Sequence, residues 1–131
     1  MSKKELQEKY IELQSLNQHI QKIQQQLGLL DQQYIELINL EANLKDLERI
    51  KEKRNTFVPL GSWIFVKSEL EQIDKVLLNI GANTLVKKTI PEAREFISRQ
   101  VKEIEDLIKR LDIELRDAVE RIQRLEEELK K

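Results

Sequence analysis

The sequence predicts a mainly α-helical protein with a small β component, a long antiparallel coiled-coil hairpin that carries two β-hairpins at its centre. Apolar residues recur at alternating steps of three and four in both outer parts of the chain, which is typical of coiled coils. The central part breaks this pattern with short β-branched and aromatic runs separated by turn residues. We therefore predict a single domain with a helix over 1–55, four strands over 56–89 and a helix over 90–131.

The first outer segment has a heptad repeat that continues for about five heptads. No proline interrupts it before Pro59, so a continuous helix over residues 3–54 would be about 75 Å long. A helix of that length needs a partner along its whole length. The predicted seam consists of Leu6, Leu13, Leu16, Ile20, Ile23, Leu27, Leu30, Tyr34, Leu37 and Leu44.

The central segment contains four short apolar runs, and Gly61-Ser62, Gln72–Asp74 and Gly81-Ala82-Asn83 separate them as predicted turns. Two hairpins alone are marginal in water, and their open strand edges invite pairing with other chains. We therefore expect this segment to oligomerise; the alternative is that its apolar residues only cap the hairpin of a monomer. The candidate oligomerisation residues are Phe57, Val58, Trp63, Ile64, Phe65, Val66, Val76, Leu78, Leu85 and Val86.

The second helix has a clear predicted start. Thr89 and Glu92 have the spacing of a capping box, and Pro91 falls in the first turn, where proline is tolerated. The predicted seam that follows consists of Ile97, Val101, Ile104, Ile108, Leu111, Leu115, Ala118, Ile122, Leu125 and Leu129.

Antiparallel pairing of the two seams permits registers that differ by one heptad. We favour the register that places Ile20 opposite Leu125, because it brings the expected end of the first helix level with the start of the second. This register leaves the amino-terminal end of the first helix, including Leu6 and Leu13, without an opposite number. That end is then either a frayed segment covered by another chain or a binding tip. The candidate tip residues are Leu6, Tyr10, Ile11, Leu13 and Leu129.

Composition and residue types argue against most kinds of chemistry. The net charge of −1 leaves no surplus of basic residues to bind the phosphates of a nucleic acid. No apolar run approaches the length of a membrane span, so we expect a cytoplasmic protein. The chain has no cysteine, and its single histidine, His19, lies beside the predicted seam among glutamine, asparagine and isoleucine residues, which is typical of a solvated histidine. We therefore predict no catalytic residues, no metal site, no cofactor and no enzymatic activity.

The central segment and the start of the second helix contain a set of short motifs. They are Val58-Pro59-Leu60-Gly61, Ile64-Phe65-Val66-Lys67, Ile80-Gly81-Ala82-Asn83-Thr84, Lys88-Thr89, Glu92-Ala93 and Glu95-Phe96. In these motifs, and in the order of long helix, short strands and long helix, the chain resembles the α-type subunits of the archaeal-like prefoldin family, in which four strands are the α-type arrangement. Trp63 and Ile64 depart from the pattern, which has small residues after the glycine.

The resemblance implies an ATP-independent chaperone of the holdase kind. Its strands would assemble it into a hexamer, either with a β-type prefoldin subunit or with copies of itself. Its coiled-coil tips would hold unfolded client proteins and pass them to a group II chaperonin. The alternative function is that of a structural or filament-forming coiled-coil spacer that binds no client.

Overall fold

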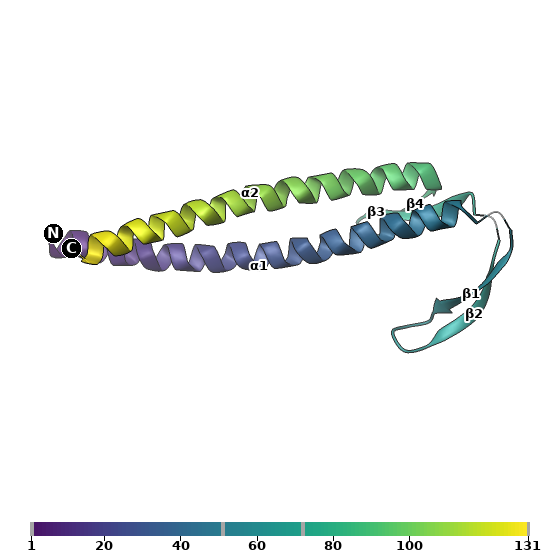
Figure 1. Ribbon diagram of the computed structural model, residues 1–131, viewed down its shortest axis with the longest axis horizontal. Helices are drawn as coiled ribbons and strands as arrows, with labels where there is room; N and C mark the ends of the chain where they lie inside the picture. The colour runs from purple at the N-terminus through teal and green to yellow at the C-terminus, as the bar shows by residue number, and fades with distance from the viewer. Residues whose placement is uncertain (1, 51, 72, 131) are drawn as a thin grey trace. The chain divides into compact units, whose positions relative to one another are not determined.

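The computed structural model describes residues 2–50, 52–71 and 73–130, and it contains the predicted helix–four strands–helix order. The predicted turn at Gln72–Asp74 and the extreme ends of the predicted helices fall partly outside these residues. Two compact units make up the chain, one from residues 1–35 and 102–131 and the other from residues 36–101. The elements, labelled in Figure 1, are α1 (Lys3–Glu48), β1 (Arg54–Pro59), β2 (Phe65–Leu70), β3 (Lys75–Gly81), β4 (Thr84–Thr89) and α2 (Ile90–Lys130).

Helix α1 is shorter than the sequence predicts. Ser2 caps its start, since the backbone N–H of Glu5 donates to the Ser2 hydroxyl at 3.2 Å. The helix ends at Glu48, and the backbone N–H groups of Arg49 and Ile50 donate three residues back to tighten the last turn. No glycine or proline marks this end, which is why the sequence pattern overestimates the length of the helix.

Helix α2 begins where the capping box predicts. The backbone N–H of Glu92 donates to the Thr89 hydroxyl oxygen at 3.3 Å, and the backbone N–H of Thr89 donates to Glu92 Oε1 at 3.2 Å. These reciprocal bonds satisfy N–H groups that the first turn of a helix leaves without partners. The transition from strand β4 to helix α2 therefore needs no loop.

The arm unit, residues 1–35 and 102–131, is held together along the predicted seam. Ile23 and Leu125 are completely buried there, and Ala118 is nearly so. Ion pairs between the helices flank the seam. Lys9 contacts Glu128 at 2.6 Å, and the Arg121 guanidinium donates to both oxygens of Glu12 at 2.9 and 3.2 Å.

These ion pairs show that the predicted register is wrong. With Ile20 opposite Leu125, both Lys9 and Glu12 would lie beyond the end of α2, and Glu12 could not reach Arg121. The contacts fit the alternative register, one heptad away, in which Leu13 lies opposite Leu125. The unpaired end of α1 is correspondingly shorter than predicted, because Lys9 and Leu13 lie within the paired region.

The first hairpin pairs β1 with β2 in antiparallel register, from Arg54 opposite Leu70 to Pro59 opposite Phe65. Pro59 is the last residue of its strand, a position that suits a residue without an N–H donor. Trp63 and Ile64, which the sequence places in a strand, lie instead in the loop before β2.

The second hairpin pairs β3 with β4 through a two-residue turn at Ala82 and Asn83, with Gly81 opposite Thr84. Both turn residues have positive φ, 49° and 60°, as a type I′ turn requires. Gly81, at φ 110°, adopts a conformation that favours glycine, and its N–H is bound by the Asn79 side chain at 2.9 Å. Within the described residues, the two hairpins form separate two-stranded sheets.

The core of the second unit, residues 36–101, lies at the start of α2. Its buried apolar residues share the spacing of one face of α2, with one residue from α1 packed among them. They are Leu44, Ile90, Ala93, Ile97 and Val101.

Candidate functional site

The β1–β2 hairpin exposes large apolar side chains to solvent. Phe57 and Phe65 are each more than half exposed, and Val58 and Val66 are about two-fifths exposed. In the loop, Trp63 is 93% exposed. Each strand also has an edge without a backbone partner in the part of the chain that the structure describes. Exposed apolar side chains beside open edges are the usual features of a surface that another chain covers.

The β3–β4 hairpin divides its apolar residues between two faces. Val76, Leu78 and Val86 are half-buried, whereas Leu77 and Leu85 are more than half exposed. Neighbouring residues of a strand point to opposite faces, which accounts for this alternation. Of the predicted oligomerisation residues in this hairpin, Leu85 is thus the one that faces solvent most.

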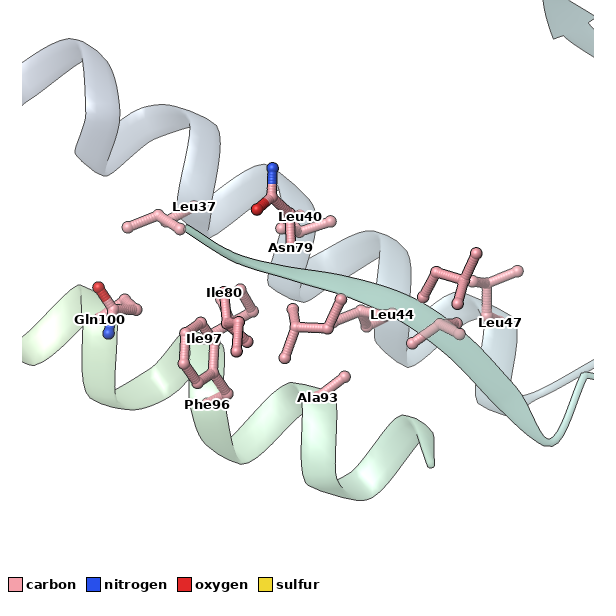
Figure 2. A pocket seen from close by; sticks show the side chains of 13 residues that line it. Leu37, Leu40, Leu44, Leu47, Asn79, Ile80, Ala93, Phe96, Ile97 and Gln100 are labelled. Atoms are coloured by element: carbon pink, nitrogen blue, oxygen red, sulfur yellow. The ribbon is translucent and has the colours of Figure 1, made fainter. Parts of the chain in front are cut away.

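An apolar groove of about 630 Å³ lies within the unit of residues 36–101, between β3 and the two helices. Figure 2 shows Ile80 close to Phe96 and Ile97, with Leu37 and Leu40 on the α1 side of β3. No charged side chain is among the described residues that line it. The lining residues are Leu37, Leu40, Leu44, Leu47, Val76, Leu77, Leu78, Asn79, Ile80, Ala93, Phe96, Ile97 and Gln100.

The predicted tip residues at the arm end fall into two groups. Leu6, Tyr10 and Ile11 are exposed, at 38%, 55% and 66%. Leu13 and Leu129 are half-buried between the helices. The structure therefore presents three of the five candidates to solvent, and assigns the other two to the seam.

The sequence interpretation missed several residues of these surfaces. Leu60, Leu77 and Ile80 are exposed apolar residues of the hairpins that the predicted set omits. The pairing that the Ala82-Asn83 turn imposes on β3 and β4 is the signal that would have separated the two faces. Leu40 and Phe96 line the groove from helix positions off the predicted seam, and no sequence pattern identifies them.

The single histidine, His19, lies near a carboxylate of the other helix. Its Nε2 lies 2.8 Å from Glu114 Oε1 on α2, and both side chains are about half exposed. Among the described residues, no group of three or more histidine, aspartate or glutamate side chains is arranged to hold a metal ion. Neither helix, over those same residues, contains a stretch long and apolar enough to cross a membrane.

Comparisons with known proteins agree on one family. The family model described as "Prefoldin subunit" matches residues 16–131. Prefoldin subunit alpha of Methanobrevibacter smithii is 40% identical over 89 residues, which cover 68% of this chain and 60% of that protein. This chain thus spans less than two thirds of that relative. The corresponding subunit of Archaeoglobus fulgidus is 28% identical over 131 residues, or 98% of this chain and 93% of its own.

A solved structure supports the fold independently. The cryo-EM structure of filamentous PFD from Methanocaldococcus jannaschii matches with a TM-score of 0.79 at 24% identity. The match covers 91% of this chain and 98% of that one. The two long helices with two separate β-hairpins, the matched family model and the related α subunits together show that this chain is a member of the prefoldin family of chaperone subunits, of the α type.

Proposed function

We propose that this chaperone subunit assembles through its β-hairpins and captures unfolded proteins at the end of its coiled-coil arm. The main observation that supports client capture is the exposure of Leu6, Tyr10 and Ile11. Tyr10 and Ile11 lie off the seam, so pairing of α1 with α2 does not cover them. An unfolded chain exposes apolar side chains, which such a surface can shield from water.

Assembly is supported by the exposed apolar residues of both hairpins and by their open edges. The assembled particle takes either a β-type prefoldin subunit or further copies of this chain as its partner, in a hexamer. Several arms on one particle raise the affinity for a client, because binding at one arm increases the effective concentration at the next. Captured clients are then passed to a group II chaperonin without ATP hydrolysis by this protein.

A double substitution at the arm end tests client capture. Tyr10→Ser with Ile11→Ser removes the two most exposed apolar groups of the tip without touching the Lys9 and Glu12 ion pairs. We expect this variant to lose most of its ability to suppress aggregation of a chemically denatured protein, as measured by light scattering. The apolar surface that holds the client would be gone while the arm stays paired.

The matched control is Leu29→Ser with Ile35→Ser. These residues are also on α1 and are 63% and 59% exposed, but they lie away from the tip. The control should protect the client as well as the unmodified protein does, and both variants should keep the native mass. Equal protection by the tip variant would show that the tip is not the client site. If the unmodified protein suppresses no aggregation at any ratio of this protein to the client, the result would instead favour the spacer function.

A further inference from the structure

The loop between β1 and β2 projects three apolar side chains into solvent. It runs from Leu60 to Ile64 and is closed by a hydrogen bond from the Leu60 N–H to the Ile64 carbonyl at 2.9 Å. Leu60, Trp63 and Ile64 are 75%, 93% and 62% exposed. A tryptophan can bury about 150–250 Å² on association. Transfer of this exposed side chain from water into an apolar site would therefore be strongly favourable. The loop, defined here as the Trp63 loop, therefore needs a cover.

The groove between β3 and the two helices has the properties of such a cover. Its volume of about 630 Å³ falls in the range of cavities that hold sizeable apolar groups. Its described lining is apolar apart from Asn79 and Gln100, so an indole would meet no charge there and would find amide groups for its N–H. Leu40, Leu77 and Ile80 line it and are still partly exposed, which leaves apolar surface to be covered.

We propose that the Trp63 loop of one copy of this chain binds in the groove of a second copy. The inference rests on the proposed assembly through the hairpins and names the contact that makes it. Tryptophan is among the residues that most often dominate the energy of an interface.

The exposed area is sufficient for an interface between copies. A stable interface buries about 800 Å² on each partner. Three aromatic residues of the hairpins are exposed, and each can bury about 150–250 Å². The exposed aliphatic residues of the same hairpins supply the remainder. These are Val58, Leu60, Ile64, Val66, Leu77, Ile80 and Leu85.

Two copies can make this contact reciprocally, with each loop in the groove of the other copy. Such a two-fold arrangement is an isologous interface, and it covers both loops and both grooves. A second copy is favoured over an unrelated partner because one chain carries both complementary surfaces.

Fluorescence of Trp63 tests the contact directly, because this is the only tryptophan in the sequence. The full-length protein is followed from dilutions at which light scattering reports a monomer to concentrations at which it reports an assembly. We expect the emission maximum to shift to shorter wavelength on assembly, and quenching by acrylamide to fall several-fold. Both changes report transfer of the indole from water to an apolar site.

A matched pair of groove substitutions locates the site. Leu40→Glu places a charge in the groove lining, whereas Ile38→Glu makes a similar change nearby on α1, outside the described lining. The two side chains are 41% and 38% exposed, so the helix should tolerate both changes, and circular dichroism checks this. Trp63 should stay exposed in the Leu40→Glu variant and become shielded in the Ile38→Glu variant.

The remaining outcomes each overturn the proposal in a distinguishable way. An assembled protein with an exposed Trp63 would reject the contact while leaving the proposed assembly in place. Shielding of Trp63 in the monomer would mean that the loop occupies its own groove. Shielding only after addition of a denatured protein would mean that a client covers it, and shielding in the Leu40→Glu variant would place the cover elsewhere. A protein that stays monomeric throughout would reject the contact together with assembly from copies of this chain, and would leave assembly with a β-type subunit as the remaining form of the proposed function.

Discussion

At the residue scale, Thr89 and Glu92 determine where α2 begins. The Thr89 hydroxyl donates to Glu92 Oε1 at 2.8 Å, and this hydrogen bond is the main cause that lowers the pKa of the Glu92 carboxyl. The backbone N–H of Thr89 and the charge of Lys88 act in the same direction. The sequence alone predicted this cap, because a capping box is formed by residues close together in the chain.

The lowered pKa makes the contribution of Glu92 dependent on pH. Its stabilising effect is present at pH values above the carboxyl pKa of the unfolded chain, about 4.3 for glutamate. It is lost as the pH falls through the lower pKa of the folded state. In the unmodified protein, acidification should lower the denaturant concentration at the midpoint of unfolding. We expect this decrease to be smaller in Glu92→Gln, because glutamine can serve in a capping box but does not titrate.

The control is Glu95→Gln, which removes a carboxylate one turn further along the same helix. Both variants and the unmodified protein are unfolded with denaturant at a series of pH values. Only in the Glu92→Gln variant should the unfolding midpoint depend less on pH in the acid range. A profile for Glu92→Gln that runs parallel to that of Glu95→Gln would contradict the assignment.

At the scale of elements, the pairing of the arms depends on a few fully buried seam residues. Leu125 is completely buried in the arm unit, and Leu107 on the same helix is 42% exposed. We expect Leu125→Ala to lower the free energy of unfolding by about 2–5 kcal/mol, through lost burial and the cavity that remains. Leu107→Ala should change it by about 0.5 kcal/mol or less, because the side chain is already partly in water.

Thermal and denaturant unfolding followed by circular dichroism measures both effects at one protein concentration. Similar losses for the two substitutions would mean that Leu125 is not a seam residue. A third substitution, Leu13→Ala, tests the corrected register. Leu13 lies opposite Leu125 in that register, so Leu13→Ala should also lower the free energy of unfolding, although the predicted register left Leu13 unpaired.

At the scale of the whole molecule, stability should depend on protein concentration if the hairpins assemble. Binding between copies stabilises the folded state by mass action. Phe65→Asp should abolish the rise of the unfolding temperature with concentration and leave a monomer by light scattering. It places a charge on a strand residue that is 59% exposed in the single chain and would be covered in an assembly.

Leu29→Asp is the matched control, since Leu29 has a similar exposure of 63% but lies on α1 outside the hairpins. It should keep the native mass and the dependence on concentration. An unchanged mass for Phe65→Asp would reject assembly through the β1–β2 hairpin.

The sequence by itself determined the features that depend on local chemistry. The heptads specified two long helices, the capping box specified the start of α2, and the Gly81-Ala82-Asn83 segment specified a tight turn. The family resemblance also rested on residues of the strands and turns. Each of these signals lies within a short stretch of chain, so no knowledge of distant contacts was needed.

The tertiary structure decided the register, the end of α1 and the composition of the groove. A heptad repeat looks the same after a shift of seven residues, so the two registers could be distinguished only by contacts such as Lys9 with Glu128. Helix α1 ends at Glu48 without a breaking residue, where the local pattern would continue. Leu40, Ile80 and Phe96 come together from three separate elements, and their shared groove exists only once those elements have packed.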